Sequence, residues 1–153
     1  MSEISRGVRI GVDVGQVRVG VALSDPDGIL ATPLVTLARD LTAATDAVPA
    51  DISELARIVE RHDAVEVVLG LPVTLAGRHG PAAIQAKAYA DRVARVIAPV
   101  RVSLMDERMS TVVASRRLSE RGVRGRRQRA VVDQAAAVEI LQSWLDGQRR
   151  RTR

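Results

Sequence analysis

Three acidic side chains lie where the sequence predicts that a strand ends or a helix begins. Asp13 closes an apolar, β-branched run, Glu107 follows a second such run, and Asp133 falls in the first turn of an expected helix. An ionised carboxylate at the end of a buried strand costs several kcal/mol unless a partner offsets its charge. A hydrogen-bonded phosphate loop or a divalent metal ion would be such a partner for Asp13.

The remaining composition favours the metal ion. The chain has no cysteine and only two histidines, so it offers neither a thiol nucleophile nor a thiolate zinc site. Three carboxylates from separate segments form an oxygen-only ligand set, which suits Mg²⁺ or Mn²⁺ rather than zinc. Two such cations can hydrolyse a phosphodiester, because one activates water and the other stabilises the leaving oxygen. Asp13, Glu107 and Asp133 are therefore the candidate catalytic and metal-binding residues, and Asp106 is expected to orient the loop.

Alternating strand and helix signals predict where these acids meet. Short β-branched runs indicate strands, and apolar residues at helical spacing indicate helices. In open α/β sheets, sites form at the carboxyl ends of the strands, so Asp13 and Glu107 should share one edge if their strands run parallel. The expected strands are Val8–Asp13, Arg18–Ser24, Ile29–Leu37, Ala64–Gly70 and Val100–Met105; the expected helices are Asp51–Arg61, Pro81–Ala98, Ser110–Arg121 and Ala130–Asp146.

This order of elements predicts an α/β fold. The first three strands can form an antiparallel meander, and the helical crossovers before the last two strands imply parallel pairing. We expect a five-stranded mixed sheet, three antiparallel strands followed by two parallel ones, with helices on both faces. The length of 153 residues fits one domain, residues 1–147, followed by a basic tail at 148–153. Gly122–Arg129 is expected to be a Gly/Arg loop.

Arginine dominates the last quarter of the chain. Residues 115–153 carry 11 arginines and four acids, whereas residues 1–114 are close to neutral. Arginine suits bidentate phosphate contacts, and here it flanks a predicted phosphodiester site, which favours nucleic-acid backbone contact over a merely solvated face. One Trp, one Tyr and no Phe leave little base stacking, so structured or duplex nucleic acid fits best. The candidate nucleic-acid-binding residues are Arg18, Arg108, Arg116, Arg117, Arg124, Arg126, Arg127 and Arg129.

Composition also indicates the class of protein and its compartment in the cell. Hydrophobic residues make up 46% of the chain, which is typical of a globular protein. No apolar run approaches the roughly 20 residues that span a bilayer, and the N-terminus lacks the layout of a signal peptide. We expect a cytoplasmic protein with no membrane partner, present as a monomer or a homodimer.

Five short fragments carry a resemblance to a known family. They are Gly11-Val12-Asp13-Val14-Gly15 followed by Arg18-Val19-Gly20-Val21-Ala22, then Ser24-Asp25, Gly70-Leu71-Pro72 with Gly77, Asp106-Glu107-Arg108 with Ser110-Thr111, and Val132-Asp133 with Ala135-Ala136. In this order and spacing they resemble the YqgF/RuvX family of the ribonuclease H-like superfamily, known as pre-16S rRNA nucleases and as Holliday junction resolvases. The resemblance covers about residues 7–147.

The resemblance implies a ribonuclease H-like fold and a metal-dependent nuclease. Asp13, Glu107 and Asp133 match the family's metal-binding catalytic acids, with Mg²⁺ or Mn²⁺ as the cofactor. Two positions depart from the family pattern: Val17 stands where a basic residue is frequent, and Thr74 stands in a loop that often carries Asn. These departures concern substrate contacts near the hairpin and leave the acids untouched.

Three classes of function remain open from the sequence. The first is a nuclease that processes the 5′ end of pre-16S rRNA or, alternatively, resolves four-way DNA junctions in recombination and repair. The second is a nucleotide-binding module, because Asp-x-Gly after a strand also resembles the phosphate loop of actin-like ATPases and sugar kinases. Those proteins close two such domains on the nucleotide, whereas this chain supplies one. The third is a non-catalytic RNA-binding factor in ribosome assembly.

Overall fold

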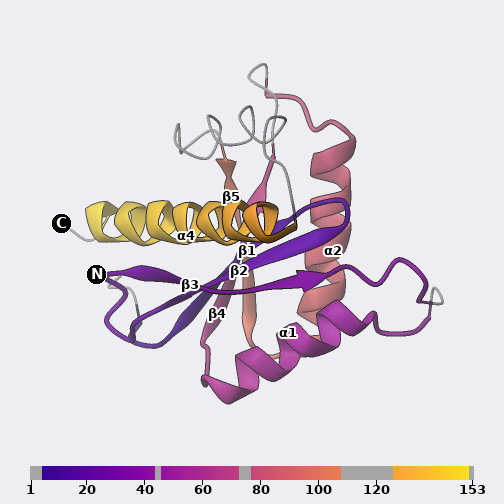
Figure 1. The fold of residues 1–153 in the computed structure, drawn as a ribbon. Helices are drawn as coiled ribbons and strands as arrows, with labels where there is room; N and C mark the ends of the chain where they lie inside the picture. Colours follow the sequence, from indigo (N-terminus) through magenta and orange to yellow (C-terminus); the bar gives the residue numbers. More distant parts are fainter. Residues whose placement is uncertain (1–4, 44–45, 73–76, 108–125, 152–153) are drawn as a thin grey trace.

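The computed structural model describes residues 5–43, 46–72, 77–107 and 126–151, with side chains over 131–150 of the last range. Five strands form one sheet, and three described helices pack on it (Figure 1). The strands are β1 (Arg9–Val14), β2 (Arg18–Ser24), β3 (Ala31–Ala38), β4 (Glu66–Leu71) and β5 (Arg101–Asp106). The helices are α1 (Ala50–Arg61), α2 (Pro81–Ile97) and α4 (Arg126–Arg151).

The sheet has the mixed topology that the sequence predicts. Its strand order is β3-β2-β1-β4-β5. β1 pairs antiparallel with β2, and β2 with β3, whereas β1 pairs parallel with β4, and β4 with β5. Because β1, β4 and β5 run in one direction, their carboxyl ends lie at the same edge of the sheet. Pro33 has no N–H group to donate to a neighbouring strand. It lies in β3, the outermost strand of the sheet, where proline is tolerated.

The last helix is longer than the sequence indicates at both ends. It runs over Arg126–Arg151, whereas the expected helix covered Ala130–Asp146. The helix therefore includes the end of the expected Gly122–Arg129 loop and most of the expected basic tail. The added turns are rich in arginine, which is a strong helix former but carries no apolar periodicity to mark it. Apolar spacing along Ala130–Asp146 also predicts that Val131 faces inward, but this prediction is wrong, since the side chain is 60% exposed. The expected helix Ser110–Arg121 lies outside the described residues.

Helices cover both faces of the sheet, α4 on one and α1 with α2 on the other (Figure 1). Successive residues of a strand face opposite sides. Ile10 and Val12 therefore pack in the core with α1 and α2, whereas Gly11 between them faces α4, where an added Cβ would lie 2.6 Å from Leu141. The same alternation turns Asp13 toward the α4 side. No helix among the described residues is both long and apolar enough to cross a bilayer.

A buried ion pair fastens the amino ends of the parallel strands. Arg9 donates from Nε to Glu66 at 3.1 Å, and the two side chains are 3% and 6% exposed. The Ser103 hydroxyl also donates to Glu66, and the Arg9 guanidinium lies 5.3 Å from the centre of the Trp144 ring. The pair links β1, β4, β5 and α4. Its charges are satisfied, which offsets much of the cost of burying them.

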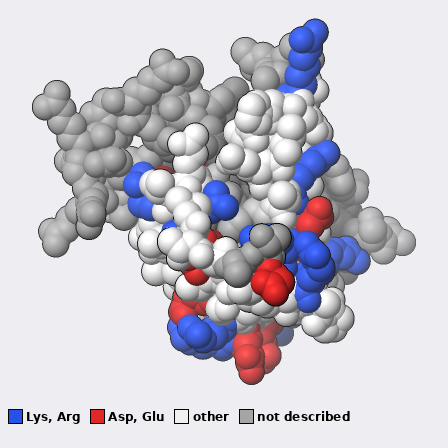
Figure 2. Space-filling model, turned by 90° about the vertical axis from the view of Figure 1, so that its right-hand side faces the viewer, with Lys and Arg blue, Asp and Glu red and all other residues white. Residues whose placement is uncertain are grey.

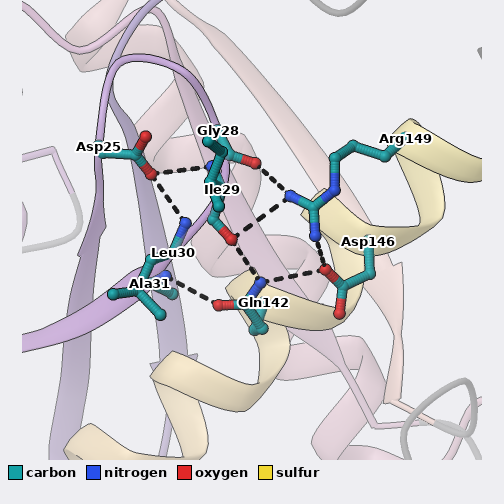
Figure 3. Close-up of polar contacts among 8 residues, drawn as sticks. All are labelled: Asp25, Gly28, Ile29, Leu30, Ala31, Gln142, Asp146 and Arg149. Carbon is teal, nitrogen blue, oxygen red and sulfur yellow. Dashed lines mark hydrogen bonds and ion pairs between the residues drawn. The ribbon is translucent and has the colours of Figure 1, made fainter.

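Asp25 organises the turn between β2 and β3 (Figure 3). Its carboxylate accepts the backbone N–H groups of Ile29 and Leu30, both at 2.8 Å. A carboxylate that accepts several backbone donors is stabilised in its charged form. These hydrogen bonds, that of Leu30 first, hold the pKa of Asp25 below its ordinary value of 3.8, although burial, the second-largest cause, acts in the opposite direction.

The carboxyl-terminal half of α4 is anchored to that turn (Figure 3). Gln142 accepts the Ala31 N–H and donates to the Ile29 carbonyl, both at 2.9 Å. Arg149 donates to the Gly28 carbonyl at 2.6 Å. These bonds fix the position of α4 along its axis. Asp133 lies nine residues before Gln142, about 14 Å toward the amino terminus of the helix.

We expect Asp25→Asn to lower the urea midpoint of unfolding at pH 7, and the difference from wild type to shrink as the pH falls below about 4. A carboxyl group whose pKa is lower in the folded state contributes its stability above the unfolded-state pKa and loses it as pH falls through the folded-state pKa. Urea titrations across this range measure the effect, with Asp63→Asn, at an exposed position, as control. A difference that stays constant with pH contradicts this role of Asp25.

Candidate active site

Two of the predicted acids meet where α4 crosses β1 and β2. Asp13 is the penultimate residue of β1 and pairs with Gly20 of β2. A Cβ built on Gly20 would lie 2.1 Å from the Asp133 carbonyl oxygen, far inside van der Waals contact. The backbone of α4 at Asp133 therefore rests directly on the strand beside Asp13.

Glu107 reaches the same edge from β5, across β4. Val12 pairs with Leu69, so Gly70 stands next to Asp13 in the sheet register. A Cβ on Gly70 would lie 2.6 Å from Oε1 of Glu107, which places this carboxylate over the glycine. Asp13 and Glu107 are 3% and 5% exposed. The structure thus brings all three acids to the α4 side of one sheet edge.

A cavity of about 400 Å³ opens at this edge. Asp13 and Asp133 line it, together with the Gly15–Arg18 turn, Pro72 and the amino-terminal part of α2. Arg18 donates from Nε to Oδ2 of Asp133 at 2.7 Å, and the two side chains are 28% and 14% exposed. Glu107 is not among the residues that line the cavity. It approaches Asp13 from the side of Gly70 instead.

The donor chemistry of this edge fits a hard divalent cation. All three side chains offer carboxylate oxygens, the ligands that Mg²⁺ and Mn²⁺ prefer. Among the described residues, no three Asp, Glu or His side chains stand close enough together to hold a metal ion as they are. Asp133 is engaged by Arg18, and Glu107 lies over Gly70. Binding a cation between the acids therefore requires these side chains to turn toward Asp13.

The predicted basic residues are only partly described. Arg18 lies at the cavity, where it contacts Asp133. Arg126, Arg127 and Arg129 belong to the first two turns of α4, but their side chains are not described. The other candidates lie outside the described residues: Arg108, Arg116, Arg117 and Arg124. Contact of these arginines with nucleic acid stays a prediction.

Sequence reasoning missed several polar residues next to the acids. Gln16 and Gln85 line the cavity, and Arg39 donates from Nη1 to the Gly15 carbonyl at 3.2 Å. For Gln85 the sequence did contain a signal. Gln85, Tyr89 and Arg92 are spaced so that they share one face of a helix. No local pattern indicates that Arg39 reaches back to the turn after Asp13.

Comparison with known proteins identifies relatives along nearly the whole chain. The family model described as "RuvX: Holliday junction resolvase" matches residues 7–147. A protein of Nocardia farcinica is 55% identical over 141 residues, which are 92% of this chain and 78% of that protein. A protein of Rhodococcus opacus is 56% identical with the same coverage. Both carry the name "Putative pre-16S rRNA nuclease".

Solved structures of low sequence identity share the fold. RuvC of T. thermophilus in complex with a Holliday junction substrate superimposes with a TM-score of 0.57 at 15% identity, over 94% of this chain and 96% of RuvC. A second Thermus thermophilus RuvC structure gives a TM-score of 0.53 over the same shares. These likenesses confirm the predicted ribonuclease H-like fold.

We expect Gly20→Ala to destabilise the fold and displace Asp133. The added methyl group would meet the backbone of α4, which cannot rotate away as a side chain can. Overpacking of this kind costs about 1–3 kcal/mol in the free energy of unfolding, and more where backbone must move. Chemical denaturation measures the loss.

Gly147→Ala is the matched control, because nothing lies within 4 Å of a Cβ at that helical position. It should be neutral or stabilise the protein by up to about 1 kcal/mol through helix propensity. A Gly20→Ala protein as stable as wild type contradicts the close contact between α4 and β2.

Proposed function

We propose that this chain, which belongs to the RuvX family, is a metal-dependent nuclease that hydrolyses phosphodiester bonds of nucleic acid. The observation that carries the proposal is the meeting of three carboxylates from β1, β5 and α4 at one sheet edge, two of them on an open cavity. The name given to the relatives, which share more than half of their aligned residues with this chain, supports the same activity.

The acids and Arg18 at this edge have different roles in the proposed reaction. Asp13, Glu107 and Asp133 would hold Mg²⁺ or Mn²⁺, with Asp133 completing the ligand set that Asp13 and Glu107 supply. When bound, such ions supply a water of lowered pKa and offset the charge of the phosphodiester. Arg18 donates from Nε to Asp133 in the structure, and its other N–H groups can donate to a phosphate oxygen in the cavity.

The proposed substrate is the 5′ end of pre-16S rRNA, processed during ribosome biogenesis. The name of the curated relatives supports this choice. The alternative is a four-way DNA junction, which the description of the family model supports. A third candidate is a non-catalytic RNA-binding assembly factor, which would use the basic residues and not the acids.

We expect Asp13→Asn and Glu107→Gln each to reduce phosphodiester cleavage at least about 100-fold, because a metal ion contributes several kcal/mol of charge stabilisation in the transition state. The measurement is cleavage of labelled pre-16S rRNA and of a synthetic four-way junction, with Mg²⁺ or Mn²⁺. Asp46→Asn, at an exposed position, is the control and should retain activity.

The outcomes separate the candidate functions. Cleavage of the rRNA but not of the junction by wild type supports the proposed substrate. Cleavage of the junction but not of the rRNA supports the alternative. Equal cleavage by wild type and Asp13→Asn contradicts the role of the acids. If wild type binds the rRNA but cuts neither substrate, the assembly-factor function replaces the nuclease.

A further inference from the structure

A second hollow adjoins the active-site cavity. Its volume is about 390 Å³, and it lies between the β1–β2 turn, the chain after β3, and the outer side of α2. Gln16 and Gln85 line both hollows, so the second hollow, called the groove below, lies directly beside the cavity that Asp13 lines. On the face of the molecule that α2 occupies, basic side chains lie around a hollow (Figure 2).

Arg39 is held in place at the base of this groove. Its backbone N–H donates to the Val17 carbonyl at 2.9 Å, and its Nη1 donates to the Gly15 carbonyl at 3.2 Å. Its guanidinium lies 5.4 Å from the centre of the Tyr89 ring. A guanidinium fixed in this way loses little conformational entropy when it binds a ligand. The same contacts tie the groove to the turn that follows Asp13.

Arg92 supplies a second positive charge near the same ring. It donates from Nη2 to the Ala47 carbonyl at 3.0 Å, and the side chain is half-buried. Burial and the neighbouring Asp51 carboxylate raise the pKa of the Tyr89 hydroxyl, while the charges of Arg39 and Arg92 act in the opposite direction. Both guanidinium groups therefore lie within electrostatic reach of the Tyr89 hydroxyl, and both arginines line the groove together with Tyr89.

The negative charge beneath the groove is buried and satisfied. Asp51 is 4% exposed and accepts the Tyr89 hydroxyl at 2.7 Å and the Asp40 backbone N–H at 3.0 Å. Among the described residues that line the groove, two are arginines and none is acidic. The surface offered to a ligand therefore carries guanidinium and amide donors, which suit phosphate oxygens.

We propose that this groove binds the sugar–phosphate backbone of the nucleic-acid strand on one side of the scissile phosphate, with Arg39 and Arg92 as its phosphate contacts. The inference rests on the proposed nuclease function and adds where the flanking strand lies. Two adjacent hollows, one lined by Asp13 and Asp133 and one by arginines, fit a polymer that lies across both rather than an isolated anion. Arg39 also orients the Gly15 turn, which couples occupancy of the groove to the position of Asp13.

The test compares Arg92→Gln with Arg61→Gln. Both variants remove one positive charge, but Arg61 is exposed on α1 and does not line the groove. Dissociation constants are measured with EDTA for the labelled pre-16S rRNA and the four-way DNA junction, across a range of KCl concentrations. Arg92→Gln should raise the Kd at least about threefold and lower the salt slope by about 0.7–0.9, as expected for one lost phosphate contact.

Arg61→Gln should leave the salt slope at the wild-type value. If Arg92→Gln and Arg61→Gln match in both Kd and slope for both nucleic acids, the groove proposal is overturned. An unchanged thermal midpoint shows that Arg92→Gln is folded. This binding test is independent of cleavage, so its failure would leave the nuclease standing. Failure of the nuclease would appear separately, as equal cleavage by Asp13→Asn and wild type.

Discussion

The close approach of α4 to the sheet is the constraint on which the site depends. Gly20 and Gly70 lack a Cβ where the Asp133 carbonyl oxygen and the Glu107 carboxylate would collide with one, at 2.1 and 2.6 Å. Because strands alternate their faces, the same side of the sheet carries Asp13. Larger residues at these glycines would lift the helix and separate the acids. The close packing of α4 on the sheet therefore brings the three acids to one edge without a ligand.

The two ends of α4 have different tasks. Its carboxyl-terminal half is fixed by Gln142 and Arg149 to the β2–β3 turn, well away from the acids. Its amino-terminal part carries Asp133, which Arg18 contacts at the cavity; because the helix begins at Arg126, Asp133 lies about two turns inside it and not in its first turn as predicted. Rigid anchoring at one end sets the height and rotation of the helix at the other. For the proposed metal site, this anchoring fixes the backbone that carries Asp133, so that only side chains need to turn toward Asp13.

Much of the fold could be predicted because its signals are local. The β-branched runs and turn residues indicate all five strands, and the strand ends then place Asp13 and Glu107 on one edge. The contacts that complete the site could not be predicted, since Arg18 meets Asp133 across 115 positions of sequence. The arginine-rich ends of α4 could not be predicted because they lack apolar periodicity. The groove could not be predicted because Arg39 and Arg92 come to line one hollow beside Tyr89 only in the folded chain.

The proposed nuclease requires Asp13, Glu107 and Asp133 to hold a divalent cation together. Calorimetric titration with Mn²⁺ in the absence of nucleic acid tests it without relying on catalysis. Wild type should bind Mn²⁺, and Asp13→Asn and Glu107→Gln should each weaken binding at least about tenfold, since each removes one anionic oxygen ligand. Binding of Mn²⁺ by Asp13→Asn with the wild-type affinity and stoichiometry would contradict the account.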